Sequence, residues 1–371
     1  MELPNITFDD APRVIFWEAT KACDLGCNHC RARSNPDRDS GELDTEEVKD
    51  MLSKLQTDGR ISFIVTGGDP LRRPDISQVI EFATELGFSS HVALSSARTV
   101  SKRNLEEMME SGMTGIALSL DGSRAKFHDK FRGNSGSFEK TIELARTCEE
   151  LGVSLQINTT VTKETMGDLP GILSLVEDLG VSRWSLFFLV PTGRGSEMVG
   201  PSGKRIEALL NWLSEVSKRK SMSVNTTEAH HYRRVRIQRL LDSGLELDEV
   251  LGRKDSTRSK IEGLGIHDGN GVMFVSHLGD VHPSGFLPLK AGSVKEDDPL
   301  MVYRNSGLFK ELRDISFRKG KCGHCEYLGV CGGSRAQAYA ASGDYLASDP
   351  NCIYQPGGAD DKISKLSGKK N

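Results

Sequence analysis

Strand-like and helix-like segments alternate regularly along the chain from Arg13 to about Val190. The strand-like segments are short and rich in Val, Ile, Leu and Phe, as expected of strands covered on both faces. Such βα repeats favour a parallel sheet with right-handed crossovers, and six repeats are too few to close an eight-stranded barrel. The sequence therefore predicts an α/β fold with an open, partial barrel. The predicted strands are Val14–Trp17, Ile61–Thr66, Ser90–Leu94, Gly115–Leu120, Leu155–Thr160 and Trp184–Val190, and the predicted helices are Thr45–Asp58, Asp75–Leu86, Lys102–Ser111, Phe138–Leu151 and Leu169–Leu179.

The remainder of the chain divides into three further parts after a barrel of residues 1–201. Residues 202–262 have a helical, charged pattern and are expected to form a linker region. Their basic run, 230–236, is interpreted as a solvated helix face, with a patch for an acidic ligand or partner as the alternative. Residues 263–356 are predicted to form a small cysteine-rich α+β domain that begins with a hairpin over 271–283. The polar segment 357–371 is predicted to be a flexible tail.

The bulk composition excludes several classes of protein. Hydrophobic residues make up 37% and charged residues 27%, which is ordinary for a globular protein. The net charge of −4 argues against a large nucleic-acid interface. The first residues lack the basic and apolar regions of a secretory signal, and no apolar run has the length of a membrane span. A cytoplasmic protein that binds neither nucleic acid nor membrane is expected.

Seven of the eight cysteines fall into two groups of different kinds. Three thiolates can hold a metal cluster and leave one metal open to a ligand, whereas four can close its coordination. The eighth, Cys148, lies on the apolar stripe of a predicted helix and is interpreted as a core residue. The first group is Cys23, Cys27 and Cys30, and the second is Cys322, Cys325, Cys331 and Cys352.

The cysteine triad directly follows the first predicted strand, at the edge where barrel loops carry chemistry. A zinc site normally has four ligands, or three and a water molecule. His29 is a possible fourth ligand, but its place between Cys27 and Cys30 is expected to turn it away. A disulfide would leave one cysteine over and does not suit the expected compartment. An iron–sulfur cluster with one open iron is favoured.

The triad together with Thr66-Gly67-Gly68-Asp69-Pro70 after the second strand resembles the radical S-adenosylmethionine (radical SAM) superfamily. The resemblance covers most of the chain and implies a partial TIM-type barrel. It also implies that the three thiolates hold a [4Fe-4S] cluster whose open iron is chelated by SAM. Reductive cleavage of SAM would give a 5′-deoxyadenosyl radical that abstracts hydrogen from a substrate. An external one-electron donor such as ferredoxin or flavodoxin is implied as a partner.

The resemblance also indicates which residues contact SAM. Gly67 and Gly68 are expected to let the backbone approach a ligand closely. Asp69 can accept from the SAM ammonium group, although the family more often has Glu there. Together with Pro70, these residues form one part of the predicted cofactor site. Ser119 and Asp121 at a later strand end are assigned to the same pocket. Weaker candidates are Ser95, Ser96, Asn158, Thr160 and Val190.

Two further segments, 120–138 and 189–195, resemble the branch that contains heme-biosynthesis enzymes and peptide maturases. Arg132 and Arg194 lie in these segments. Each is interpreted either as a ligand for a carboxylate or cofactor or as a brace for a loop, and the two interpretations are given equal weight.

The second cysteine group resembles the ligand pattern of SPASM domains, which implies a second, auxiliary [4Fe-4S] cluster. Structural zinc is the alternative, because four cysteines also suit that ion. A full SPASM domain has seven cysteines and two auxiliary clusters. Here Ser284 and Arg335 stand where cysteines are expected, so only one auxiliary cluster is predicted, in a SPASM- or twitch-like domain.

Three functions follow from these features. The first is a radical SAM oxidoreductase that oxidises or decarboxylates a side chain of a tetrapyrrole. The second is a maturase that modifies a ribosomally made peptide. The third, of another class, is a non-catalytic iron–sulfur electron-transfer protein or a zinc-stabilised binding protein. The segment Gly67–Pro70 beside an incomplete triad favours the enzymes over the third function.

Overall fold

The computed structural model describes residues 3–95, 100–219, 222–252, 261 and 263–357. Ser96 and nearly all of the predicted tail lie outside the described residues. In the described part of the chain, no helix has both the length and the apolar character needed to cross a bilayer.

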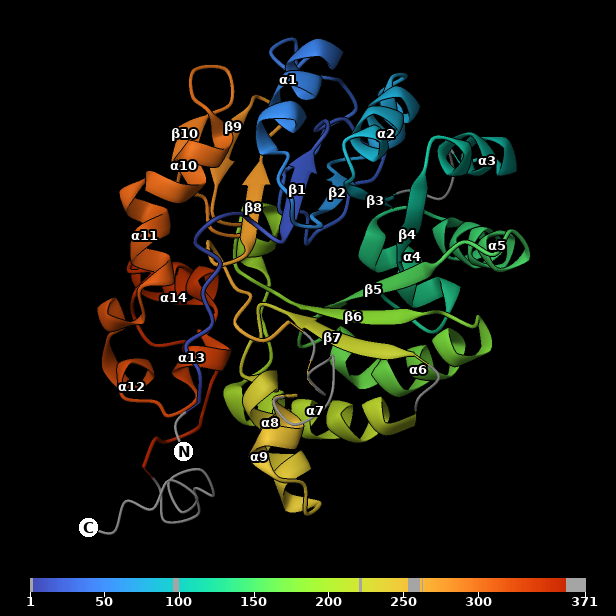
Figure 1. The fold of residues 1–371 in the computed structure, drawn as a ribbon. Helices are drawn as coiled ribbons and strands as arrows, with labels where there is room; N and C mark the ends of the chain where they lie inside the picture. Colours follow the sequence, from blue (N-terminus) through green and yellow to red (C-terminus); the bar gives the residue numbers. More distant parts are fainter. Residues whose placement is uncertain (1–2, 96–99, 220–221, 253–260, 262, 358–371) are drawn as a thin grey trace.

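One continuous sheet curves around the centre of the molecule (Figure 1). Its order is β10-β9-β8-β1-β2-β3-β4-β5-β6-β7. The neighbours from β8 through β7 run parallel, and β9 and β10 are antiparallel additions. The predicted open barrel is confirmed. The strands are β1 (Val14–Glu18), β2 (Ser62–Thr66), β3 (Ser89–Ala93), β4 (Met113–Ser119), β5 (Leu155–Val161), β6 (Arg183–Phe188), β7 (Ser223–Thr227), β8 (Val272–Val275), β9 (Asp280–His282) and β10 (Gly292–Ser293).

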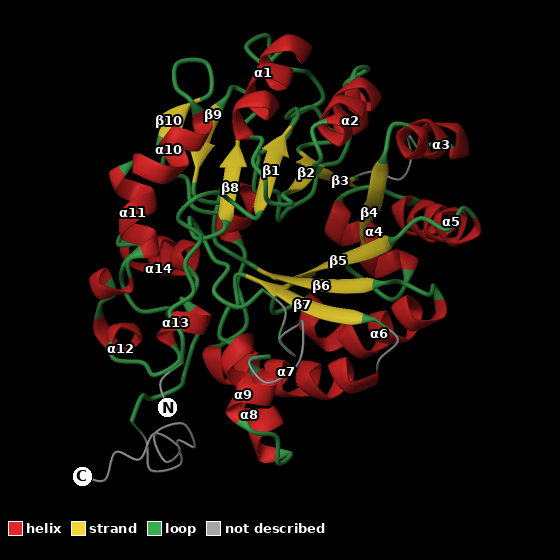
Figure 2. Cartoon of the chain, viewed as in Figure 1, coloured by secondary structure: helices red, strands yellow, loops and turns green. Residues whose placement is uncertain are grey.

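The strands form an inner layer, and helices cover the outer face of the curved sheet (Figure 2). The first helix begins with a capping box in which the N–H of Glu47 donates to Asp44 and the N–H of Asp44 donates to Glu47, both at 2.8 Å. One helix, α4, is not predicted by the sequence because its segment is charged and its start has no side-chain cap. The helices of this part are α1 (Thr45–Leu55), α2 (Ile76–Glu85), α3 (Lys102–Glu110), α4 (Ala125–Arg132), α5 (Ser137–Glu150), α6 (Leu169–Asp178) and α7 (Gly203–Val216).

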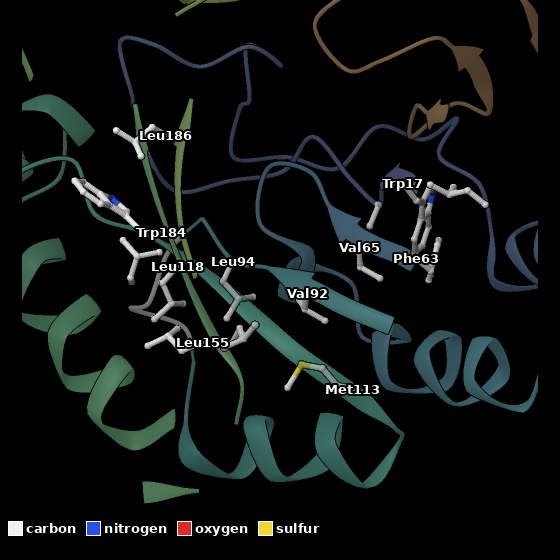
Figure 3. Close-up of a cluster of buried hydrophobic side chains, with 14 of the residues drawn as sticks. Trp17, Phe63, Val65, Val92, Leu94, Met113, Leu118, Leu155, Trp184 and Leu186 are labelled. Carbon is white, nitrogen blue, oxygen red and sulfur yellow. The ribbon is translucent and has the colours of Figure 1, made fainter. Parts of the chain in front are cut away.

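The main core lies between the sheet and these helices. Side chains along β5 alternate between buried and partly buried, which is the period of a strand. Trp17 and Trp184 are fully buried, and Figure 3 shows them among apolar side chains from β1 to β6. Cys148 is also fully buried in this core, as its helical stripe predicts.

The sheet runs through the predicted domain boundaries. β7 falls within the predicted linker, and β8 falls within the predicted C-terminal domain yet pairs with β1. The predicted hairpin over 271–283 is the pair β8–β9. The domain limits themselves remain predictions. The remaining helices are α8 (Tyr232–Asp242), α9 (Leu247–Val250), α10 (Pro299–Asn305), α11 (Gly307–Arg313), α12 (Gly320–Gly323), α13 (Leu328–Cys331) and α14 (Arg335–Ser342).

The basic run 230–236 is not a solvated helix face, so that prediction was wrong. His230, His231 and Arg234 are buried, with at most 7% of their surface exposed. Arg234 donates to both carboxylate oxygens of Glu207, at 2.8 Å from Nη1 and 2.5 Å from Nη2. The run therefore packs α8 against α7 and the C-terminal part of the chain.

Candidate active site

The cysteine triad lies in the loop that leaves the C-terminal end of β1. Cys23 and Cys27 are buried, Cys30 is partly buried, and the three pack with Leu25 in a small cluster of their own. The N–H of Cys23 donates to the carbonyl of Asn35 (2.7 Å), and the N–H of Cys30 donates to the carbonyl of Cys27 (3.2 Å). The loop thus closes on itself and packs the three cysteines in one cluster.

The three thiols differ in their ionisation. Burial raises the pKa of Cys23 to about 11 and also raises the pKa of Cys27. Burial acts in the same direction on Cys30, but hydrogen bonds from the Ser34 hydroxyl and N–H outweigh it, so its pKa is lowered. Metal binding to the triad would therefore release protons, since a metal ligand must be a thiolate.

Glu18, the last residue of β1, anchors this loop and was not predicted from the sequence. Its carboxylate accepts from Arg31 Nη2 (2.6 Å) and contacts His277 Nδ1 (2.9 Å). Burial raises the pKa of Glu18, but Arg31 and His277 more than offset this and hold it at about 2. The Arg31 guanidinium also lies 4.7 Å from the centre of the Phe274 ring on β8. The loop is thereby tied to both β1 and β8.

The segment Gly67–Pro70 lies directly against the cysteine loop. The N–H of Gly68 donates to Thr20 and the N–H of Asp69 donates to Ala22, both at 2.7 Å. A Cβ on Gly67 would lie 2.5 Å from the Thr20 carbonyl oxygen, and one on Gly68 would overlap the carbonyl oxygen of Ala22. These glycines are therefore required for a close approach to the loop backbone. The predicted close approach to a ligand stays a prediction.

Asp69 is fully buried at the end of this segment. Its side chain accepts from the N–H of Leu71 (3.2 Å) and caps the short 3₁₀ helix Pro70–Arg72. Asp69 lies close enough to Cys23 for its charge to raise the pKa of that thiol. Asp69 thus lies beside Cys23, and the assignment of Asp69 and Pro70 to a SAM site stays a prediction.

Asp121, which follows β4, forms a buried ion pair with Arg132 at the end of α4. Asp121 accepts from the N–H of Thr160 (2.6 Å) and from Arg132 Nη1 (3.2 Å). The other terminal nitrogen, Arg132 Nη2, donates to the carbonyl of Ser95 (2.8 Å). Arg132 thus joins the ends of β3 and β4. It braces these loops, which is one of the two roles predicted for it. Ser119, the last residue of β4, is partly buried at the same edge.

Arg132 also reaches the cysteine loop through His29. Arg132 Nη1 lies 3.4 Å from His29 Nε2, and the His29 ring stacks on Phe131 with 4.5 Å between ring centres. The ring is therefore engaged with α4, consistent with the expectation that His29 is not a fourth ligand of the triad. Burial lowers the pKa of His29 to about 4, so the ring is neutral at physiological pH.

Arg194 also braces the cysteine loop. It lies in the 3₁₀ helix Gly193–Glu197 after β6. Its Nε donates to the carbonyl of Cys27 (2.9 Å), its Nη1 to that of Ser34 (2.8 Å), and its backbone N–H to that of Cys30 (2.9 Å). The preceding Gly193 has a φ of 58°, and a Cβ there would overlap the loop carbonyls.

The second cysteine group is assembled from α12, α13 and the segment after α14, away from the triad. The N–H of Cys325 donates to the carbonyl of Cys322 (3.2 Å), and Lys321 donates to the carbonyl of Cys352. Cys325 and Cys331 pack against an apolar cluster that includes Tyr327 and Val330. Across the described ranges, no three His, Cys, Asp or Glu side chains are placed to hold a single metal ion.

The partly buried Arg233 and the buried Arg318 lie next to the second group. Arg233 Nη1 donates to the carbonyl of Cys331 (3.2 Å), and Arg318 Nη2 donates to that of Leu312 (2.5 Å). Burial lowers the pKa of Arg233 to about 10 and that of Arg318 to about 9. A cation removed from water is costly without a countercharge. The two guanidinium groups therefore fit an anionic group bound at the second cysteine group.

The two positions where cysteines were expected are filled by other buried side chains. Ser284 accepts from the N–H groups of Phe286 and Leu287, both at 3.3 Å. Arg335 is fully buried and donates to the carbonyls of Tyr345 (2.9 Å) and Ala347 (2.7 Å). Neither side chain is a sulfur ligand, and both have partners within the protein.

Comparison with known proteins identifies the family. The model of the radical SAM superfamily matches residues 17–176. The AdoMet-dependent heme synthase of Methanosarcina barkeri is 37% identical over 353 residues, which are 95% of this chain and 99% of that protein. This chain belongs to the radical SAM superfamily. It is an enzyme, and membership implies SAM and a [4Fe-4S] cluster as cofactors.

Other relatives in the family have different names. The PqqA peptide cyclase of Rhodopseudomonas palustris is 27% identical, with 93% of this chain and 88% of that protein covered. The structure of Streptococcus suis SuiB bound to precursor peptide SuiA has a TM-score of 0.72 at 20% identity, covering 93% of this chain and 76% of that one. This structural likeness shows a shared fold.

Proposed function

We propose that this enzyme oxidises or decarboxylates a side chain of a heme-type tetrapyrrole by radical SAM chemistry. The observation that carries the proposal is the closed, braced loop that gathers Cys23, Cys27 and Cys30 at the end of β1. A set of three sulfur ligands fits a [4Fe-4S] cluster with one open iron. When bound, the cluster and SAM supply the 5′-deoxyadenosyl radical, and the protein positions it and excludes competing reactions.

The residues around the loop have defined parts in this proposal. Gly67 and Gly68 seat the segment Gly67–Pro70 against the loop, so that Asp69 lies beside Cys23. We assign Asp69, Pro70, Ser119 and Asp121 to the SAM pocket, because they gather at one edge of the barrel. Arg132 and Arg194 both contact the loop and help to fix its position.

We assign an auxiliary [4Fe-4S] cluster to Cys322, Cys325, Cys331 and Cys352. The guanidinium groups of Arg233, beside Cys331, and of the buried Arg318, near Cys322, support an anionic occupant. A zinc ion bound by four thiolates is also anionic, so iron content and spectroscopy must separate the two. An electron donor such as ferredoxin or flavodoxin, and a cytoplasmic location, complete the proposal.

The relatives support the tetrapyrrole substrate over the peptide. The heme synthase of M. barkeri is 37% identical to this chain and nearly matches it in length, whereas the peptide cyclase of R. palustris is 27% identical. Peptide maturation remains the second candidate, because the same fold binds a precursor peptide in SuiB.

Mass spectrometry of the products tests the proposal. The reconstituted enzyme, SAM, a one-electron reductant and iron coproporphyrin are incubated without oxygen. The account predicts 5′-deoxyadenosine and a porphyrin that has lost CO₂ and two hydrogens from a side chain. An unchanged porphyrin, together with modification of a precursor peptide, would establish the second candidate instead.

A further inference from the structure

A cavity of about 990 Å³ opens beside the cysteine loop. Asn28 of that loop, α4, the turn after β5 and the 3₁₀ helix after β6 form its walls. All of these walls follow the C-terminal ends of strands, the edge where barrel enzymes bind substrates. Its volume lies at the upper end of the range for small-molecule sites, so it suits a large ligand.

The cavity carries an excess of positive charge in a chain whose net charge is negative. Four cationic side chains line it, against the two carboxylates of Glu164 and Glu197. Lys130 and Lys163 are exposed to solvent, and no ion pair or hydrogen bond of their side chains occurs within the described residues. The two lysines are therefore available to an anionic ligand. The four cationic residues that line the cavity are Arg33, Lys130, Lys163 and Arg194.

The arginines tie the cavity to the triad. Arg194 donates to the carbonyl of Cys27, and Arg33 Nη2 donates to that of Gly193 (3.4 Å). Arg33 has a φ of 51°, a strained backbone conformation of the kind that concentrates at functional sites. A ligand in this cavity would thus lie next to the cysteine loop.

The lining also includes apolar side chains. Phe127, Phe131 and Met198 line the cavity, and Val199, which also lines it, is 66% exposed. Apolar surface combined with several cations suits a flat, hydrophobic molecule that carries carboxylate groups at its edge.

We propose that this cavity binds the carboxylate side chains of the tetrapyrrole substrate, with Lys130 and Lys163 as specificity-determining cations. The inference rests on the proposed function, since it takes the substrate to be a polycarboxylate porphyrin. Its concave form favours a small molecule over the acidic surface of a protein electron donor, which would need a broader interface.

A matched pair of double variants tests this. Lys130→Gln/Lys163→Gln removes two cavity cations. Lys126→Gln/Lys140→Gln removes the same charge from α4 and α5 outside the cavity, and Lys126 and Lys140 are also exposed. All four lysines are on the surface, so both variants are expected to melt at the wild-type temperature. The reconstituted full chain is titrated with coproporphyrin and binding is followed by the Soret shift.

The expected result is an affinity about fivefold weaker for Lys130→Gln/Lys163→Gln, with a smaller salt dependence, and unchanged for the control pair. Equal affinities of the two double variants would overturn the inference and leave the proposed function standing. The inference is also overturned if Lys130→Gln/Lys163→Gln binds porphyrin normally but is reduced more slowly by flavodoxin. Failure of the wild type to bind porphyrin would instead refute the proposed function.

Discussion

Arg194 donates from Nε to the carbonyl oxygen of Cys27, 167 positions earlier in the chain, at 2.9 Å. The same guanidinium holds Ser34, so one side chain fixes both the middle and the end of the cysteine loop. The fork geometry of arginine makes this possible, because lysine is a single point donor. The loop that carries the thiols is therefore positioned in part by the end of β6, a distant segment of the chain.

Arg194→Lys is expected to loosen the loop. Unsatisfied buried carbonyls cost about 1–3 kcal/mol, so the variant should lose the SAM-responsive EPR signal to a chelator faster than wild type. Arg103→Lys, at an exposed ion pair on α3, is the matched control and should behave as wild type. Equal rates of loss for Arg194→Lys and wild type would show that the brace has no effect.

Gly68→Ala is expected to disable the site. Its Cβ would overlap the carbonyl of Ala22, a backbone atom that cannot move without shifting the cysteine loop. Reductive SAM cleavage should fall by at least about tenfold, which corresponds to about 1.4 kcal/mol. Gly26→Ala tests a glycine in the loop itself, where a Cβ meets nothing within 4 Å. If the two variants cleave SAM equally well, the packing explanation is wrong.

The pair Asp121–Arg132 is expected to behave as a unit in a double-mutant cycle. Asp121→Asn leaves the buried Arg132 charge unpaired and should cost about 3–5 kcal/mol in the free energy of unfolding. Arg132→Gln added to Asp121→Asn should recover part of that loss, because the uncompensated charge is gone. Strictly additive losses in denaturant unfolding would mean that the two residues are not coupled.

Glu18→Gln is expected to destabilise the protein by an amount that does not vary between pH 7.5 and 5. The carboxyl pKa is lowered from 4.5 to about 2, so its contribution is fully present above pH 4.5 and is lost only as pH falls toward 2. The shift corresponds to a contribution on the order of 3 kcal/mol. Urea unfolding of both proteins at several pH values measures it. A difference that shrinks between pH 7 and 5 would contradict the assigned ion pairs.

Much of the fold follows from the sequence, since the apolar strands β1 to β6 and the capped helix α1 carry local signals. β7 does not, because Ser223–Thr227 is mostly polar and only Val224 is buried. The start of helix α4 also lacks a side-chain cap. Its part in the site depends on tertiary contacts, such as that of Arg132 with Asp121, which leave no local sequence signal.

The site divides in the same way. The spacing of Cys23, Cys27 and Cys30 is enough to predict a metal-binding triad, because one short loop supplies all three residues. The contact of His277 with Glu18 spans 259 positions and leaves no local pattern in either segment. The partners of Glu18 are therefore visible only once the chain is folded.

The central claim is that the triad, and not the second cysteine group, supports radical formation. The direct test is anaerobic SAM cleavage by the triple variant Cys23→Ala/Cys27→Ala/Cys30→Ala, with EPR of the remaining cluster. The account predicts no 5′-deoxyadenosine, while the signal of the cluster held by Cys322, Cys325, Cys331 and Cys352 survives. Continued SAM cleavage by this variant would contradict the claim.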